Sequence, residues 1–375
     1  MKILELAPIR TCGLLLVLAL LGIGCASPIA LNAARRNFNN GQLEEADKVL
    51  APLPNDQNKV LTLMERGMIR HVRRDYTNST ADWLTAVRLE KELEVNSITK
   101  AGASMVVNDS TLAFRGYPFE QTYLHVYLAK NYLAVGQWSE AGVEARSVAL
   151  AMENLDGFPD DAFAHYMAGF CLELCGDDSN AAMQYRQVAR VAPESGIDET
   201  TGRFRSASSP TNHPVALPAN ACELVCFLDF DGYAGMVPYS AAIYANGQLL
   251  GTSRTLTSIF QLQTASSERM ATRHAAKTLS RLAVKGAIAI AVWSRDENLG
   301  FFTGLLLLAL EDNDMRRWET LPAKLAVARV PCPSDLRQFD VEFRSYSGQV
   351  SRRVTVTAPL FRKDRVFVSI CRDNP

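Results

Sequence analysis

The hydrophobic and polar positions of residues 28–195 follow a helical period that repeats along the chain. Two segments, Leu128–Val148 and Ala168–Val188, carry small, large apolar and glycine residues at matching offsets, 40 residues apart. The matching positions are Ala129, Tyr132, Gly136, Trp138 and Ala141 in the first segment, and Gly169, Leu172, Gly176, Asp178 and Ala181 in the second. The glycine between helices lets the chain reverse, and the small residues let two helices approach closely. The pattern therefore predicts stacked pairs of antiparallel helices.

Two weaker copies of this pattern precede the strong ones. Residues Asn39–Ala46 repeat the junction between two helices, and Gly67, Tyr76, Trp83 and Ala86 fit a further unit. This skeleton resembles the tetratricopeptide (TPR) repeat, a helix pair of about 34 residues. The longer spacing of the strong copies places an extra loop at Asp156–Asp160, and Glu90–Phe119 interrupts the array. We therefore expect a TPR-like domain over residues 28–195.

The TPR resemblance implies a concave surface that suits an extended peptide or a partner helix. The groove positions of that family fall on Met68, His71, Tyr123, Val126, Lys130, Phe163, Tyr166, Phe170 and Glu173. Aromatic side chains with a few charges are typical of protein-binding surfaces. Packing against a neighbouring segment of the same chain is the alternative role for these residues.

After residue 195 the composition and the period both change. Residues 196–220 are rich in Pro, Ser, Thr and Asn and predict a linker. Residues 221–375 then carry several short apolar or alternating runs that predict strands, together with expected helices at Ser267–Ala289 and Leu299–Leu310. The second of these helices is too short to span a membrane. The sequence thus predicts a multidomain chain, with the all-α repeat domain followed by an α+β domain with antiparallel strands.

The N-terminus has the features of an export signal. A short positive start precedes the apolar run Cys12–Ile23, and small residues lead to Cys25. This end resembles the lipobox of bacterial lipoproteins, which implies that residues 1–25 are a signal peptide and that Cys25 carries the lipid. The family prefers Leu three positions before the cysteine, where this chain has Gly22, so ordinary signal cleavage nearby is the alternative. Ala26 and Ser27 lack the aspartate retention signal of that class, which implies the outer membrane.

Six further cysteines leave the disulfide pairing open. They are Cys171, Cys175, Cys222, Cys226, Cys332 and Cys371. Export permits disulfides. On one strand, Cys222 and Cys226 lie ~13 Å apart, too far to bond, and Cys171 and Cys175 are poorly oriented on a helix. A bridge from the first pair to Cys332 or Cys371 is one reading, and apolar core packing is the other.

The run Val225–Gly232 raises an enzymatic alternative. An apolar strand that ends in Asp229-x-Asp231-Gly resembles the start of haloacid-dehalogenase-type phosphatases, in which the two carboxylates work with Mg²⁺. The following residues depart from that family, and no H-E-x-x-H, G-x-S-x-G or P-loop motif is present. His125 and His165 occupy the same repeat position, about 10 Å apart, which favours packing over a shared metal. We expect no metal and no cofactor.

Several blocks, in order, resemble a poorly characterised family of bacterial TPR-containing envelope lipoproteins. The blocks are Phe114–Glu120, His125–Gly136, Gly235–Pro238, Arg281–Lys285 and Asp314–Arg329. The resemblance implies a lipoprotein that faces the periplasm and has no known catalytic residues. With a net charge of −1, no global field favours nucleic acid. The sequence therefore predicts a non-enzymatic adaptor that binds an envelope protein or peptide through the TPR-like groove.

Overall fold

The structure is a computed structural model that describes residues 26–99, 113–205, 217, 221–231, 237–272, 316–357 and 360–373. Its helices are α2 (Ala26–Asn39), α3 (Leu43–Leu50), α4 (Lys59–Val72), α5 (Tyr76–Thr99), α6 (Pro118–Ala134), α7 (Trp138–Glu153), α8 (Ala162–Leu174), α9 (Asp178–Val191) and the 3-10 helix η3 (Pro193–Ser195). Residues 259–272 are also helical. None of these described helices has the length and apolar composition needed to cross a membrane. The predicted signal peptide and Cys25 lie outside the described residues, as do residues 299–310.

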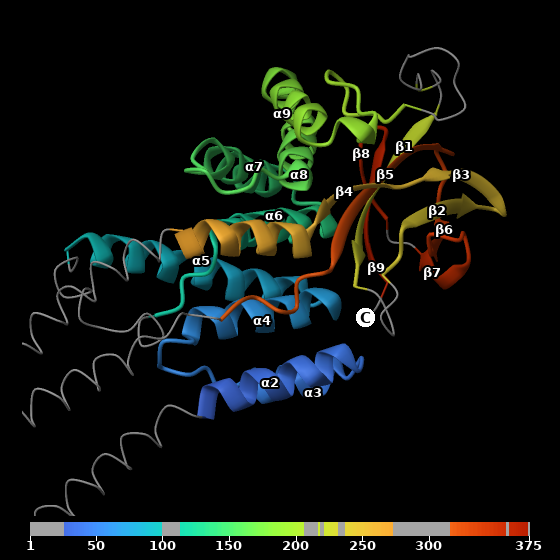
Figure 1. Cartoon of the computed structure of the whole chain (residues 1–375). Helices are drawn as coiled ribbons and strands as arrows, with labels where there is room; N and C mark the ends of the chain where they lie inside the picture. The colour runs from blue at the N-terminus through green and yellow to red at the C-terminus, as the bar shows by residue number, and fades with distance from the viewer. Residues whose placement is uncertain are drawn as a thin grey trace, which may run out of the picture.

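Within the described residues, the helices α2–α9 form four pairs, and each pair reverses through the same turn (Figure 1). At the four turns, the backbone N–H groups of Gln42, Asp75, Gln137 and Asp177 donate to carbonyl oxygens five residues earlier, at 2.8–3.0 Å. The residue before each donor has positive φ, and these residues are Gly41, Arg74, Gly136 and Gly176. This is the Schellman geometry, which glycine adopts without steric cost. The predicted TPR-like helix pairs are confirmed, with an arginine at the second turn.

Close contacts within the pairs explain the small residues of the repeat. A Cβ atom on Gly67 would lie 2.3 Å from Nε1 of Trp83, and one on Gly169 would lie 2.8 Å from Cε1 of Tyr185. The large ring of the second helix therefore packs directly on the backbone of the first. These glycines let the two helices of a pair come together.

The remainder of the chain forms two sheets. The strands are β1 (Cys222–Phe230), β2 (Ser240–Ala245), β3 (Gln248–Thr252), β4 (Arg254–Ser258), β5 (Lys324–Cys332), β6 (Gln338–Arg344), β7 (Val350–Thr357), β8 (Phe361–Lys363) and β9 (Val366–Arg372). Among the described residues, one sheet has the order β4-β5-β1-β9-β8 and the other β3-β2-β6-β7. Strand β1 is parallel to β9, and the other pairings are antiparallel. The predicted α+β part with antiparallel strands is confirmed.

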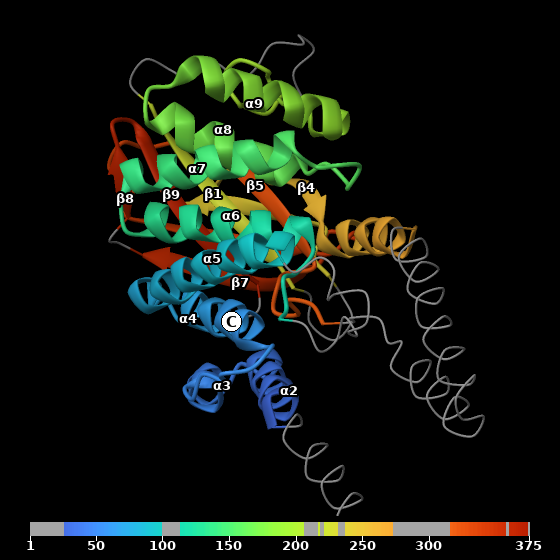
Figure 2. The ribbon, with the colours of Figure 1, turned by 90° about the vertical axis from the view of Figure 1, so that its left-hand side faces the viewer.

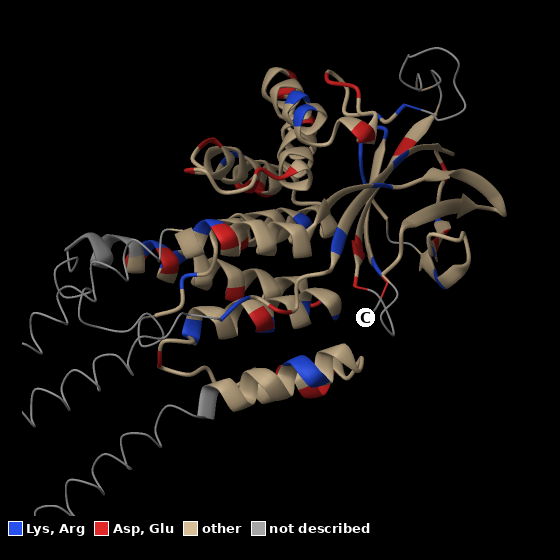
Figure 3. Ribbon diagram, viewed as in Figure 1, with Lys and Arg blue, Asp and Glu red and all other residues tan. Residues whose placement is uncertain are grey.

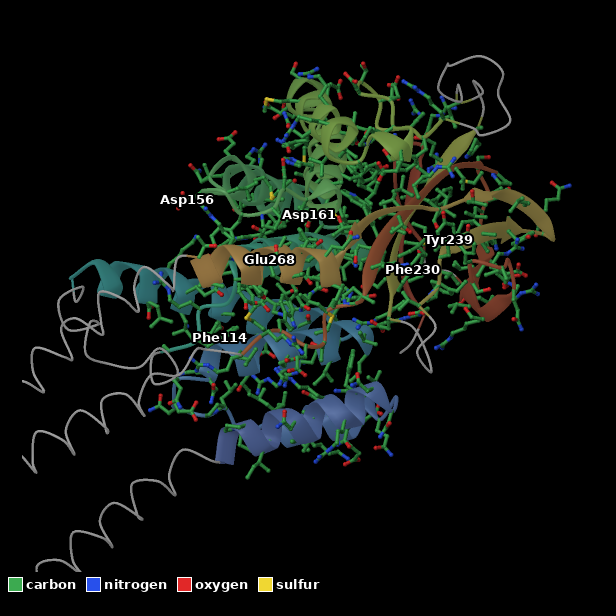
Figure 4. The ribbon with its side chains drawn as sticks, in the orientation of Figure 1. Phe114, Asp156, Asp161, Phe230, Tyr239 and Glu268 are labelled. Atoms are coloured by element: carbon green, nitrogen blue, oxygen red, sulfur yellow. The ribbon has the colours of Figure 1, made fainter. Side chains whose placement is uncertain are left out.

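The molecule has three layers, with the five-stranded sheet in the middle (Figures 1 and 2). Strand β1 is buried on both faces, which explains its unbroken apolar sequence. Val225 and Phe227 belong to the core shared with the helices, whereas Leu224 and Phe230 belong to the core between the two sheets. Phe230, labelled in Figure 4, has its ring centroid 5.7 Å from that of Phe343 on β6.

The helical part and the sheet part, which the sequence predicts as two domains, do not have separate hydrophobic cores. Helix and sheet residues share one continuous hydrophobic cluster. The first part of the expected linker is packed as well, because Ile197 and Phe204 form a β-bridge and the Phe204 ring stacks 5.5 Å from Tyr166. The extra loop predicted near Asp156, labelled in Figure 4, accepts a hydrogen bond at its carbonyl oxygen from Arg269 at 3.1 Å.

Candidate functional site

The predicted groove residues lie on α4, α6 and α8, the first helices of their pairs. In the structure they do not line an open groove. Met68, Tyr123, Val126, Lys130, Phe163, Tyr166 and Phe170 have no exposed surface, His71 is 4% exposed, and the Glu173 side chain is 25% exposed. The expectation of a free partner-binding surface is therefore corrected, because the five-stranded sheet of the same chain covers this face.

An aromatic side chain from β1 fills the part of the groove that belongs to α8. The ring of Phe227 lies 6.1 Å from Phe163, 6.3 Å from Tyr166 and 5.4 Å from Phe170, with steep angles between the planes. Such edge-to-face contacts are favourable beyond the burial of area alone. The strand thus makes the kind of contacts that a bound segment makes in a helical groove.

A buried ion pair joins α6 to the same strand. The Nζ of Lys130 donates to Oδ1 of Asp229 at 2.5 Å, and the hydroxyl of Tyr127 donates to Oδ2 at 3.2 Å. Burial lowers the pKa of Lys130, although the Asp229 carboxylate acts in the opposite direction. Each carboxylate oxygen of Asp229 therefore accepts a hydrogen bond, which a buried charge needs because it has lost its contacts with water.

The charged groove residue Glu173 is also used within the chain. Arg329 on β5 donates two hydrogen bonds to Glu173, at 2.9 and 2.7 Å, and two to Glu223 on β1, at 3.2 and 2.9 Å. Arg203 donates two more to Glu223. Burial alone would raise the pKa of Glu223, but Arg329 and Arg203 hold it below its usual value. The network connects α8, the expected linker and two strands.

At the N-terminal end of the array, Arg372 on β9 makes the corresponding contacts. Its guanidinium donates to both oxygens of Asp231, at 2.5 and 2.7 Å, and lies 5.0 Å from the ring centroid of Phe38 on α2. One of its nitrogens lies 3.1 Å from the sulfur of Met68. Burial raises the pKa of Asp231 to about 6, although Arg372 lowers it. The sheet is thus attached to α2, α4, α6 and α8.

The groove residue His71 belongs to a buried polar and aromatic cluster. Its Nδ1 lies 2.6 Å from Oδ1 of Asn131, and its ring packs against Tyr127 and Trp83 at 5.4 and 5.7 Å. Burial, with a further contribution from the charge of Lys130, lowers the pKa of His71 to about 3. The imidazole is therefore neutral at physiological pH and acts as part of the core.

The two histidines at matching repeat positions have matching partners. Nδ1 of His125 lies 2.6 Å from Oε2 of Glu144, and Nδ1 of His165 lies 2.6 Å from Oε1 of Gln184. In both cases the partner stands 19 residues later, on the second helix of the pair. The repeat position of these histidines therefore fixes one helix to its neighbour.

The geometry does not favour the phosphatase alternative. Asp229 is fully buried with both oxygens engaged, and Asp231 pairs with Arg372. Strand β1 lies in a mixed sheet, parallel to β9 and antiparallel to β5, rather than in an all-parallel sheet. Over the residues that the structure describes, no group of three or more His, Cys, Asp and Glu side chains is arranged to hold a metal ion.

Side chains available to a partner lie on the outside of the molecule. Tyr346, which is 86% exposed, follows β6, and its ring lies 5.1 Å from that of Tyr239, labelled in Figure 4. Val350 at the start of β7 is also exposed and lies opposite Arg344 in the sheet. The sequence pattern gave no signal for this patch, because its residues flank strands instead of facing the core. Basic and acidic residues are interspersed along the described helices and strands (Figure 3).

Comparisons with known proteins add little to these observations. No protein-family model and no curated protein matches the chain. Among solved structures, MamA 41-end from Desulfovibrio magneticus RS-1 is 16% identical, with 46% of this chain and 78% of that chain covered and a TM-score of 0.32. Two structures of a kinesin light chain with TPR-like repeats from Podosopora anserina are 15% identical over 44% of this chain and 94% or 95% of theirs, with TM-scores of 0.23 and 0.22. The TPR-like assignment therefore depends on the helix turns described above.

Proposed function

We propose that this chain is a non-enzymatic interaction scaffold of the bacterial cell envelope. In this proposal Cys25 carries the lipid, and the body faces the periplasm at the outer membrane. One observation carries the scaffold role, namely that the face of the helical array with the expected groove residues is covered by the chain's own sheet. The helices then serve as a rigid support, and partners bind outer surfaces of the molecule.

The start of the first described helix supports attachment close to the membrane. Helix α2 begins at Ala26, directly after the cysteine that we expect to be acylated. The helix is fixed to the body, because Arg35 donates to Oε1 of the buried Glu65 and to the carbonyl oxygen of Arg317. Because the described chain is helical from Ala26 onward, a lipid on Cys25 would hold the scaffold close to the bilayer.

The patch formed by Tyr239 and Tyr346 is the surface that we assign to an envelope protein or peptide. Tyrosines are enriched at protein interfaces because they offer a large apolar area and a hydroxyl group at low entropic cost. Both tyrosines are largely exposed, Tyr346 more than Tyr239, and their rings lie against each other next to the ends of β2 and β6.

Site-specific photo-crosslinking in intact cells tests this assignment. A photoreactive residue at Tyr346 should give one discrete adduct, and the same residue at Leu150, which is exposed on α7, should not. Equal adducts from both positions, or none from Tyr346, would contradict the assignment. A Cys25→Ala variant tests the anchor. The variant protein should no longer be found in the outer-membrane fraction, and a photoreactive residue at Tyr346 in it should give much less adduct.

A further inference from the structure

Four of the six described cysteines lie on one face of the five-stranded sheet. Cys222 and Cys226 stand on β1, Cys332 on β5 and Cys371 on β9. All four are buried in the core between the two sheets. The central strand therefore carries one cysteine near each of its two neighbouring strands.

Cys222 and Cys332 are directly opposite each other in the antiparallel pair of β1 and β5. Side chains at opposite positions point to the same face, and their Cβ atoms are about 4.5–5.5 Å apart. The backbone spacing of such a pair is within the range found for disulfides. Both thiols are free in the structure, and the register places the two residues at a backbone spacing that a cross-strand disulfide can use.

Cys226 and Cys371 meet across the parallel pair of β1 and β9. Their positions are offset, since Cys371 is opposite Leu228, yet their Sγ atoms lie 3.6 Å apart. The thiol of Cys226 donates to the sulfur of Cys371. Side-chain rotation is needed to close this gap to the ~2 Å of a disulfide.

The other two cysteines differ from these pairs. On α8, Cys171 contacts the sulfur of Met167 at 3.8 Å, and Cys175 donates to the carbonyl oxygen of Trp138 at 3.4 Å. The sulfur of Cys175 also lies in the space that Gly142 leaves free. Both therefore behave as packed helix residues and serve as internal controls.

We propose that Cys222–Cys332 and Cys226–Cys371 are disulfides in the mature protein and join β1 to both neighbours. This inference rests on the proposed export, because disulfides persist in oxidising compartments. The oxidant is a protein disulfide of the thiol–disulfide oxidoreductase class. One cysteine thiolate attacks that disulfide to form a mixed disulfide, and the thiolate of the second cysteine then displaces the oxidoreductase thiolate. The oxidoreductase takes up the two protons that the cysteine thiols lose, so each new bond reduces one oxidant disulfide to a dithiol.

Once the two sheets have packed against each other, the buried cysteines react poorly. The disulfides therefore form before folding is complete. Burial raises the pKa of Cys226 and, to about 12, that of Cys332, whereas the hydrogen bond from Cys226 lowers the pKa of Cys371. All four thiols are buried between the two sheets, so an oxidant protein has little access to them once the strands are packed. Reduced, folded protein should oxidise slowly, and a denaturant should accelerate the reaction.

Peptide mapping of the full chain from cells tests the proposal. Cells are quenched in acid, thiols are blocked with N-ethylmaleimide in denaturant, and the chain is digested without reduction. We expect two linked peptides with the stated pairs, and labels on Cys171 and Cys175 only. A label on any of the other four cysteines contradicts the pair to which it belongs. The mass of the N-terminal peptide reports separately whether Cys25 is acylated.

Refolding separates the pairing from the export. If the peptide map shows that the chain keeps its leader and that all thiols are free, the chain is not exported. In that case the purified reduced protein is refolded in a glutathione redox buffer. Formation of the two stated pairs supports the pairing, and any other map overturns it. A Cys226→Ala variant should free Cys371 and lower the Tm by roughly 5–10 °C. The matched variant Cys171→Ala should leave both linked peptides in place.

Discussion

The Nζ of Lys130 lies 2.5 Å from Oδ1 of Asp229, and neither side chain has exposed surface. The two residues are 99 positions apart, one on a helix of the repeat array and one on the central strand. Each charge lies in the core that the helices and the sheet share, and its counter-charge comes from the other part. The pair therefore indicates that the helices and the sheet fold as one unit.

Removal of one member of this pair should cost more than removal of both. In Lys130→Met, Asp229 keeps its charge with only the Tyr127 hydroxyl as a donor, so we expect a loss of about 3–5 kcal/mol in the free energy of unfolding. The double variant Lys130→Met/Asp229→Leu has no buried charge and should regain most of that loss. Urea unfolding of the three proteins measures the difference.

An exposed ion pair provides the matched control. Lys48 and Glu45 are 2.7 Å apart at the surface of α3, so Lys48→Met should leave the unfolding midpoint unchanged. If the double variant is as unstable as Lys130→Met alone, the loss does not come from an unpaired buried charge on Asp229, and the prediction is wrong.

The ring of Phe227 should be a large contributor to the attachment of the sheet. Phe227→Ala leaves a cavity between three aromatic rings of α8, which should cost about 3–5 kcal/mol in the free energy of unfolding. Phe260→Ala, at a ring that is 72% exposed, should change stability little. Similar unfolding midpoints for the two variants would mean that the rings of α8 close over the cavity.

The helical part alone should expose an apolar face. Residues 28–195 end before β1, so Tyr123, Phe163 and Phe170 would lose their cover. We expect this fragment to associate and to bind an apolar fluorescent dye strongly, whereas the full chain should bind little. A monomeric fragment with weak dye binding would contradict the shared core.

The helix pairs could be predicted because their determinants are local. Gly136 and Gly176 mark turns that are set by a few neighbouring residues, and in the structure both glycines adopt the left-handed conformation that reverses the chain. Arg74 shows the limit of this approach. It adopts the same conformation without the glycine that identifies such a turn in sequence.

The cover over the groove could not be predicted, because it depends on contacts between distant residues. The groove positions on α8 were identified correctly as one face, but the apolar run of β1 does not reveal what packs on it. One signal was available in retrospect. Asp229 interrupts a run of buried apolar residues, so its carboxylate required a buried cation such as Lys130.

Alanine substitutions at two turn glycines distinguish the cost of backbone strain from the cost of a steric clash. A Cβ at Gly176 would meet no atom within 4 Å, so Gly176→Ala should cost only the left-handed conformation, about 1–2 kcal/mol. At Gly136 the added Cβ would lie 2.7 Å from Cδ1 of Phe361 on β8, so Gly136→Ala should cost more. Equal losses in urea unfolding would mean that Phe361 moves aside freely.

The buried imidazole of His71 should make stability fall in weakly acidic solution. Its pKa is about 3 in the folded chain and about 6.5 in the unfolded chain, so between these values the unfolded state binds one more proton. The free energy of unfolding should then decrease by about 1.4 kcal/mol per pH unit, or roughly 2 kcal/mol from pH 6.5 to pH 5. Urea unfolding across this range measures the slope.

The variant His71→Gln isolates the contribution of the imidazole, because an amide can still donate to Oδ1 of Asn131 but does not titrate. Asp231 acts with the opposite sign. Its raised folded pKa of about 6 stabilises the folded chain at low pH, and this contribution is lost as the pH rises through that value. Both proteins contain Asp231, so its effect cancels in the difference between their curves. Parallel curves for the wild type and His71→Gln would show that His71 takes up a proton in the folded chain.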